Sequence, residues 1–552
     1  MKAKNKQIIL KLSLFMGIVF LFTLSFNTAF AATDTSKIYV DKNGNDSWDG
    51  LSRVYNQTSG SGPKATISNA KSIVKKKGTI HIARGTYKES NIIIDKDMTI
   101  IGESQEGTII QGINGKNSIF IILPSVEVAI NNLTLTGSKK TGYGGAIYNE
   151  GTLTMNRCTI TRNYAEKGGT IYNKGHVTLN QCTLKENYAE KGGAIYNIGV
   201  LNLNKCNFKE NKAEQGGAIY DLGNSNLINC TFTHNIATSS VFSVSLGGAI
   251  YNEGTLTLTN SEFTNNTSDN YGGAIYNIGK LTATNCMFLN NFADGYGGAI
   301  HNSGDLNIID CNLSRNKAIN GGAIYNHLTG TLTVINSIFL NNKAICLGGA
   351  IFNFEKLTVT GSRFLNNFAG DEGGAIINYN KCSINDCIFT GNNATIGGAL
   401  SNSYVFTTMK VTNCILTGNQ AHLGGAIYNT EKLIVTNSFF SGNQAYCGGA
   451  IYNTEVSIFA GGSIYKKDQL IVNNCTFNNN TAYFEGSDIS STCSRLNNAV
   501  RIAFRKSFFG KIWFYIELAI DWLDSDNKTS IELSKSSVTV DPQLELNKQS
   551  LG

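Results

Sequence analysis

The sequence predicts an all-β protein, a right-handed parallel β-helix in which one coil repeats along most of the chain. The phrase GGAIYN, first complete at residues 144–149, recurs almost letter for letter as far as residues 448–453. Its copies are mostly 24 or 25 residues apart, which is the signature of a solenoid. The 552 residues include 58 glycines, only 3 prolines and 15% charged residues. Because a single core rarely serves more than about 250–300 residues, a chain of this length and composition grows by repetition.

Each copy of the repeat predicts three short strands. The apolar runs within one copy, as at residues 144–165, alternate with period two and are punctuated by Gly and Asn. Equivalent strands of successive copies pair in parallel about 4.8 Å apart, so thirteen coils predict a rod of about 60 Å. The thirteen copies are marked by Gly-Gly pairs that begin at Gly144, Gly168, Gly192, Gly216, Gly247, Gly272, Gly297, Gly321, Gly348, Gly373, Gly397, Gly424 and Gly448.

Stacking places equivalent residues in columns, which can be compared within this one sequence. The Ile of GGAIYN is always a large aliphatic residue, so this column is predicted to face the core. The next column is mostly Tyr but accepts His301, Phe352, Ile377 and Ser401, a tolerance that predicts the outer face. A ladder of tyrosines there would offer rings and hydroxyl groups to a ligand, or would only stack and stiffen the rod. The candidate binding residues are Tyr148, Tyr172, Tyr196, Tyr220, Tyr251 and Tyr276.

Two asparagine columns are predicted to be structural ladders, because stacked amides can hydrogen-bond from coil to coil while their backbones form turns. In the column that ends GGAIYN, Asn is replaced only by Asp221. The second column contains Asn163, Asn187, Asn211, Asn235, Asn266, Asn291, Asn316, Asn342, Asn367, Asn392, Asn419, Asn443 and Asn480.

Most of the 13 cysteines are predicted to be buried free thiols. Nine of them share one column with serines, which can form neither disulfides nor soft-metal sites, so the column needs only a small residue. These nine are Cys158, Cys182, Cys206, Cys230, Cys286, Cys311, Cys387, Cys414 and Cys475. Cys346, Cys382, Cys447 and Cys493 lie off the column and are candidates for pairing or reaction.

The repeat also resembles a known family. GGAI together with F-x-x-N, as in FKEN (208–211) and FLNN (364–367), resembles the polymorphic outer membrane protein repeat of chlamydial surface proteins and of adhesin-like proteins from methanogenic archaea. The resemblance covers about residues 140–483. It implies an adhesin-like role at the cell surface and carries no catalytic residues.

The N-terminal part is predicted to contain a leader and a cap. Residues 1–31 have a lysine-rich start, an apolar run and a small-residue ending, so they read as a secretory signal or as an uncleaved anchor. Residues 32–140 form the N-terminal cap and the first coils, and they resemble the start of pectin-lyase-like β-helix proteins. Ile67, Ala70, Ile73 and Val74 share one helical face that would plug the open end of the core.

The repeat β-helix is assigned to residues 141–483, and residues 484–552 to a C-terminal cap or attachment segment. Within the latter, residues 508–523 show helical spacing, which predicts a capping helix or a segment that binds a membrane surface or a partner. The period is broken by insertions at 238–245 and near 454–469, which are either drifted turns or binding turns.

Enzymes with this fold need clustered carboxylates, and the columns offer none, so neither catalytic residues nor cofactors are predicted. Glu166, Glu190 and Glu214 stack beside Lys167 and Lys191, which indicates an ion-paired solvated edge, with a weak Ca²⁺ site as the alternative. No metal site is assigned.

The charge pattern argues against nucleic acid. The net charge is +7, but four lysines lie in the leader and +3 remains without them, and no basic cluster interleaves with aromatics.

Together these patterns predict a non-catalytic, adhesin-like protein, secreted or at the cell surface, that binds extracellular polysaccharide or another cell. Membrane contact would come only through anchoring. A polysaccharide-active lyase, hydrolase or esterase is the first alternative, and a passive structural surface protein is the second.

Overall fold

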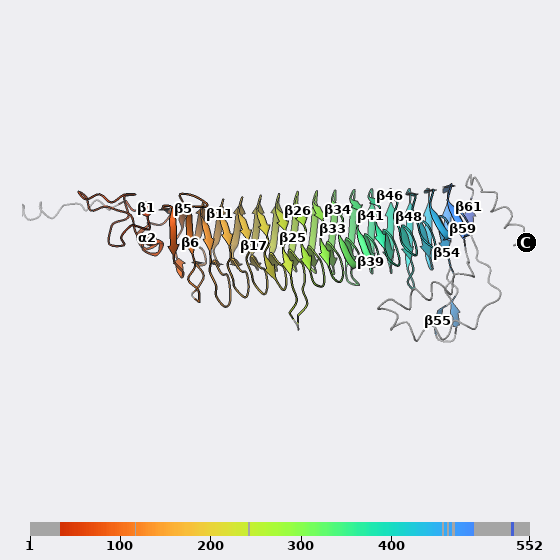
Figure 1. The fold of residues 1–552 in the computed structure, drawn as a ribbon, viewed down its shortest axis with the longest axis horizontal. Helices are drawn as coiled ribbons and strands as arrows, with labels where there is room; N and C mark the ends of the chain where they lie inside the picture. Colours follow the sequence, from red (N-terminus) through yellow and green to blue (C-terminus); the bar gives the residue numbers. More distant parts are fainter. Residues whose placement is uncertain are drawn as a thin grey trace, which may run out of the picture.

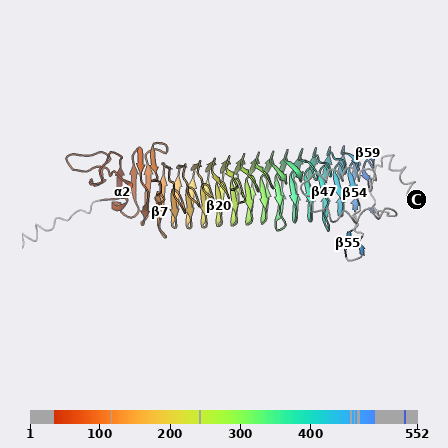
Figure 2. The same cartoon turned by 60° about the horizontal axis from the view of Figure 1, so that its bottom comes forward.

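The computed structural model describes residues 34–490, except 116, 241–242, 455–457, 461–462 and 466–469, together with the strand at 532–534. The chain winds into a straight rod of stacked coils, with the N-terminal helix at one end (Figure 1). The same row of parallel strands is seen from a second side (Figure 2). The predicted parallel β-helix is therefore confirmed.

One coil contributes one strand to each of three long sheets. The coil that begins at Gly144 contains β10 (Ile147–Asn149), β11 (Thr152–Asn156) and β12 (Thr159–Thr161). The sheets that contain β10 and β12 have 16 strands each, and the sheet that contains β11 has 18. Pairing to the next coil is parallel and in register, as between β10 and β13 (Ile171–Asn173), where Ile147 pairs with Ile171.

The GGAIYN phrase supplies the strands of what we call the IYN sheet. Before the first repeat come β4 (Ile92–Ile94) and β7 (Phe120–Ile122), and after the last repeat comes β60 (Ile489–Ser490). The strands of the thirteen repeats are β10, β13, β16 (Ile195–Asn197), β20 (Ile219–Asp221), β24 (Ile250–Asn252), β28 (Ile275–Asn277), β32 (Ile300–Asn302), β36 (Ile324–Asn326), β40 (Ile351–Asn353), β44 (Ile376–Asn378), β47 (Leu400–Asn402), β50 (Ile427–Asn429) and β54 (Ile451–Asn453).

A fourth, shorter sheet forms at the corner that follows the second Asn ladder, and we call it the corner sheet. Its strands are β19 (Lys212–Ala213), β23 (Ile236–Ala237), β27 (Thr267–Ser268), β31 (Phe292–Ala293), β35 (Lys317–Asn320), β39 (Lys343–Leu347) and β43 (Phe368–Ala369). Isolated parallel bridges extend the same pairing in both directions, to Lys139 and to Gln444.

The Gly-Gly pair is required by the backbone for two different reasons. The first glycine has a positive φ of 62–70° in all thirteen repeats, a conformation that other residues rarely adopt. The second glycine lies against the next coil: a Cβ on Gly248 would be 2.0 Å from the carbonyl oxygen of Gly273. The Gly-Gly pair therefore recurs because the turn and the close stacking of successive coils both require glycine.

The interior of the rod is built from columns of apolar side chains. The Ile column is buried throughout, with exposed fractions of 0–1%, as predicted. The strands in line with β12 add a column of stacked rings, including Phe208 and Phe232, whose ring centroids are 4.7 Å apart. The apolar interior is one continuous cluster from the N-terminal helix to Phe477.

Both asparagine ladders are present, but their backbones differ from the prediction. The amide nitrogen of Asn291 donates to Phe263 O (2.9 Å) and to Asn316 Oδ1 (3.1 Å), and this pattern repeats along the column. The ladder asparagines do not have positive φ. In the second ladder the residue before each asparagine does, as in Asn290 (φ 54°), because that residue makes the turn while the ladder side chain points inward.

The N-terminal end is closed by α2 (Ile67–Ile73), as the helical face predicted. Thr66 caps the helix by accepting a hydrogen bond from Asn69 N. Ile67, Ala70 and Val74 are buried, and Ile73 packs against the same core. The helix thus covers apolar side chains that the first coil would otherwise expose.

The second insertion contains an antiparallel hairpin, β55 (Ile458–Ala460) and β56 (Ser463–Tyr465), which projects from the side of the rod (Figure 1). At the C-terminal end β61 (Glu532–Ser534) pairs with β57 (Leu470–Asn473). The predicted leader, residues 1–31, and the predicted helix, residues 508–523, lie outside the described residues.

Candidate functional site

The predicted tyrosine ladder lies on the outer side of the IYN sheet. Neighbouring rings from Tyr148 to Tyr276 have centroids 4.4–5.6 Å apart and are stacked, so the ladder is continuous through six coils. His301 and Tyr325 continue it with stacked rings. The spacing agrees with the coil-to-coil distance of about 4.8 Å.

The ladder is covered, which contradicts the expectation of an open outer face. Tyr172, Tyr196, Tyr220 and Tyr251 are only 6–8% exposed, while Tyr148 and Tyr276 are half-buried. Burial raises the pKa of Tyr196 to about 12. The rings stack face to face, so the alternative that they stiffen the rod is the better supported one.

The cover comes from the turns on either side of each three-residue strand. Leu222, Leu246 and Ile278 pack against the rings from these turns. The ammonium group of Lys191 lies 5.1 Å from the ring centroid of Tyr220, and Lys167 lies 5.4 Å from that of Tyr196. Alternation within a strand predicted the outward direction correctly, but it could not reveal that neighbouring side chains fold over so short a strand.

These lysines also correct the prediction of an ion-paired edge. The backbones of Glu166, Glu190 and Glu214 stack as expected, with Glu190 N donating to Glu166 O at 3.0 Å. Lys167 and Lys191 instead lie over tyrosine rings, and the ion pairs found in the described residues do not include them. Within that same described part, no group of three or more His, Cys, Asp or Glu is arranged to hold a metal ion.

A column that is more exposed than the tyrosine ladder lies on the corner sheet. Tyr188 is 42% exposed, Ile236 36% and Phe368 39%, although each pairs in register with its neighbours. The signal in the sequence was the variable residue between Asn and Ala in the N-x-A segment. We call this set the corner column: Tyr164, Tyr188, Lys212, Ile236, Thr267, Phe292, Lys317, Lys343, Phe368, Asn393, Gln420 and Gln444.

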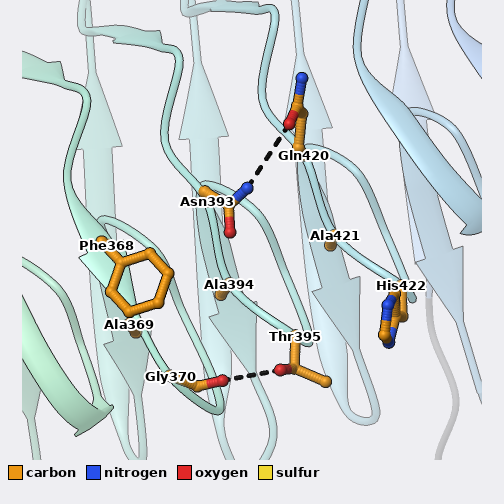
Figure 3. A pocket seen from close by; sticks show the side chains of 9 residues that line it. All are labelled: Phe368, Ala369, Gly370, Asn393, Ala394, Thr395, Gln420, Ala421 and His422. Atoms are coloured by element: carbon orange, nitrogen blue, oxygen red, sulfur yellow. Dashed lines mark hydrogen bonds between the residues drawn. The ribbon is translucent and has the colours of Figure 1, made fainter.

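A groove of about 320 Å³ lies at the C-terminal half of the corner column (Figure 3). One side is formed by Phe368, Asn393 and Gln420. The other side is formed by the residues two positions further along each coil, Gly370, Thr395 and His422. Asn393 Nδ2 donates to Gln420 Oε1 at 3.5 Å, and Thr395 Oγ1 donates to Gly370 O at 2.6 Å.

One pair of carboxyl groups was not singled out from the sequence. Glu372, next to Asp371, is 5% exposed, and its Oε2 accepts a hydrogen bond from Ser403 Oγ at 2.8 Å. Burial raises the pKa of Glu372 to about 7 and also raises the pKa of Asp371. Ser401 occupies the tyrosine column here, and the small side chain interrupts the ladder.

The cysteine column is buried, as predicted. All nine thiols are free and 0–3% exposed, and each Sγ donates to backbone, as Cys182 does to Asn180 O. Of the off-column cysteines, Cys346 and Cys382 are free and Cys447 is in a disulfide. Cys493 lies outside the described residues.

These features define a repeat-built parallel β-helix with a sealed interior and an exposed corner column. The chain carries the Chlamydia polymorphic membrane protein repeat, which matches residues 260–278, 285–303 and 437–454. The resemblance drawn from GGAI and F-x-x-N is thereby confirmed, and this repeat is typical of surface proteins. No curated protein matches the chain significantly.

Solved structures with low similarity include, by their titles, α-1,3-glucanases and an alginate lyase. The catalytic unit of a thermostable GH87 α-1,3-glucanase from Streptomyces thermodiastaticus is 11% identical, with 83% of this chain and 70% of that chain covered and a TM-score of 0.28. A PL6 alginate lyase in complex with a trisaccharide is 11% identical, with 83% and 96% covered and a TM-score of 0.28.

A GH87 α-1,3-glucanase catalytic domain in complex with tetrasaccharides is 10% identical, with 78% of this chain covered and a TM-score of 0.27. The chain spans 66% of that domain's length. We draw no functional argument from similarities at this level.

No helix in the described residues is both long enough and apolar enough to cross a membrane.

Proposed function

We propose that this protein is an exported, non-catalytic, adhesin-like β-helix that binds extracellular polysaccharide or the surface of another cell. The observation that carries the proposal is the corner column, whose side chains stand in register along the rod and are exposed or partly exposed. An extended polymer laid along the rod would meet a similar position every 4.8 Å or so. Such a surface can gain affinity from many weak contacts.

The secretory pattern of residues 1–31 and the membrane protein repeat support a location outside the cell, either secreted or anchored through the N-terminal segment. The corner column mixes aromatic, amide and lysine side chains. That mixture suits hydroxyl-rich or weakly charged surfaces better than nucleic acid, which requires denser positive charge.

Screening of residues 32–552 on a glycan array and on whole cells tests the proposal. Saturable binding to a polysaccharide or to cells is the expected result. Absence of saturable binding on both would leave the passive structural protein as the better reading.

The enzyme alternative has one specific observation in its favour, the Asp371–Glu372 pair with raised pKa values. Glu372 is nearly inaccessible and already bonded to Ser403, so a substrate could not reach it without displacement of its cover. Reducing-end and unsaturated-product assays on pectins, alginates and glucans decide this point. Turnover that Asp371→Asn or Glu372→Gln abolishes would overturn the non-catalytic proposal.

A further inference from the structure

The groove at Phe368 differs from the rest of the corner column in its charge. Earlier coils carry a charged residue at one or both of the two outward positions, as at Glu190, Asp294 and Lys317, with Ile236 and Thr238 as the exception. From Phe368 and Gly370 onward, no Asp, Glu, Lys or Arg occupies either position through Thr481 and Tyr483. The groove therefore begins where charged residues no longer occupy these two positions, although Asp371 directly follows Gly370.

Gly370 marks the coil at which the groove begins. The equivalent positions in neighbouring coils carry Ile345 and Thr395, and a Cβ on Gly370 would be 2.0 Å from Ile345 O, so only backbone fits at this place in the lining (Figure 3). Thr395 Oγ1 donates its hydrogen to Gly370 O. The hydroxyl oxygen can therefore still accept a hydrogen bond from a ligand in the groove. The groove is thus lined partly by backbone and partly by side-chain groups that can accept or donate hydrogen bonds.

The lining supplies both kinds of contact that a sugar ring needs. Phe368 is 39% exposed and offers apolar aromatic surface for the C–H groups of a pyranose. The amides of Asn393 and Gln420 each present a donor and an acceptor, and the one hydrogen bond between them is long, at 3.5 Å. Sugar hydroxyl groups are donors and acceptors at once, so they match amides better than they match charged groups.

The geometry also sets the size and direction of the ligand. Phe368 pairs with Asn393, and Asn393 pairs with Gln420, in three successive parallel coils. Three coils at about 4.8 Å span about 10 Å along the rod axis. That length suits two consecutive pyranose rings of a chain that lies along the axis.

We infer that this groove is a binding subsite for two consecutive residues of a neutral polysaccharide, with Phe368 as the stacking platform and Asn393 and Gln420 as hydrogen-bonding partners. The inference rests on the proposed function, because it names the place and the ligand class for polysaccharide binding. Lys343 lies beside the site. Its ammonium group is 5.2 Å from the Phe368 ring centroid and makes a cation–π contact with that ring. An anionic polymer would find its cations further back along the rod.

Calorimetric titration with neutral hexasaccharides of glucan, xylan and mannan, and with anionic hexasaccharides of galacturonate and alginate, tests the inference. Phe368→Ala and Asn393→Ala should each weaken binding of the neutral ligand at least tenfold, as expected for a central contact. The matched control is Phe292→Ala. Phe292 occupies the same column and also lies under a lysine, Lys317 at 5.5 Å, but Asp294 stands at the position of Gly370 and neither residue lines the groove.

Phe292→Ala should change affinity less than twofold, and circular dichroism should show that all variants keep the β-helix. Neutral binding that survives Phe368→Ala and Asn393→Ala would overturn the inference and leave the proposed function intact. Binding of anionic ligands alone would do the same. If the wild-type chain binds neither glycans nor cells, both the inference and the proposed function are wrong.

Discussion

Asp221 shows how a single residue in a ladder sets a protonation state. It takes the place of an asparagine on β20, between Asn197 and Asn252. Its Oδ1 accepts from Asn197 Nδ2 at 2.7 Å, but its Oδ2 and the facing Asn252 Oδ1 are buried without a partner. Two bare acceptors in register are repulsive unless a proton lies between them. Burial raises the pKa of Asp221, which agrees with a protonated carboxyl that donates to Asn252.

We predict that Asp221→Asn stabilises the protein at pH 8 by about 1–3 kcal/mol, because the amide restores the donor permanently. The folded-state pKa is raised, so the stability from the protonated Asp221 is present at low pH and lost as pH rises through that pKa. The advantage of Asp221→Asn should therefore shrink as pH falls toward 4. Urea unfolding at several pH values measures it. The exposed Asp294→Asn is the control, and an equal response of both variants would contradict the protonated ladder.

His301 introduces the opposite pH dependence. It is 4% exposed between the rings of Tyr276 and Tyr325, and its Nδ1 is buried without a partner. Burial first, and the nearby His327 second, lower the pKa of His301 to about 3. The imidazole is therefore neutral in the fold at pH values where an unfolded histidine would be protonated.

We predict that His301→Tyr protects the protein against acid. A depressed folded-state pKa gives stability that is present above about pH 6.5 and lost as pH falls toward 3, which amounts to about 2 kcal/mol at pH 5. Tyrosine is the usual occupant of this column and would continue the stack. Thermal unfolding from pH 8 to pH 4 should show the difference. His176→Tyr, at an exposed site, should leave the acid sensitivity in place. If His176→Tyr also removes the acid sensitivity, then His301 is not its source.

At the scale of the strand and the turn, the repeat determined most of what could be predicted. The Ile column, the buried thiols and the Asn ladders were predictable because one sequence contains thirteen copies, so each column shows what it tolerates. The helix α2 was predictable from Ile67, Ala70 and Val74 on one face.

Burial outside the core was not predictable in the same way. The tyrosine column tolerates Ser401 and His301, which reads as exposure, yet Leu246 and Lys191 cover it from the adjacent turns. The groove at Phe368 is lined by variable turn residues of three successive coils, and a comparison of repeats averages such variation away. Contacts between side chains of adjacent turns depend on the three-dimensional structure and do not follow from the repeat pattern alone.

The internal Asn ladder should contribute more to stability than any exposed asparagine. Asn291 is fully buried and is bonded to four groups: Phe263 O, Asn316 Oδ1, and the backbone and side-chain nitrogens of Asn266. Asn291→Ala would leave these groups buried without partners, at about 1–3 kcal/mol for each that stays unsatisfied. We predict a loss of at least about 3 kcal/mol, measured by urea unfolding. Asn202→Ala, on the exposed side of β17 (Val200–Asn204), should cost less than about 0.5 kcal/mol.

At the scale of the whole molecule, the three main strands of each described coil pair with the equivalent strands of neighbouring coils. The strands pair with the preceding and following coils, and no segment of the described repeat returns to a distant coil (Figure 1). Stability in such an architecture is close to a sum over coils and over the interfaces between them. The number of coils, and with it the length of the rod, should therefore be variable without a change of fold.

We predict that removal of two complete coils, residues 272–320, leaves a folded and shorter rod. The deletion joins Tyr271 to Gly321 and recreates the sequence DNYGGAIYN that already occurs at 269–277. β24 would then pair with β36, so that Ile250 meets Ile324 and Tyr251 meets Tyr325. In the same way Asn266 would bond to Asn342. The same Asn–Asn side-chain hydrogen bond joins successive coils along the rest of this ladder.

Small-angle X-ray scattering should show a maximum dimension shorter by about 10 Å, two coils at about 4.8 Å each, with an unchanged cross-section. Removal of residues 272–308 is the matched control, because it ends in the middle of β33 (Asp305–Ile309) and brings the next coil into the wrong register. That variant would turn buried columns outward and should lose its β-rich circular dichroism spectrum or aggregate. If the two-coil deletion fails in the same way, the coils are not interchangeable, and the fold depends on contacts that the repeat does not supply.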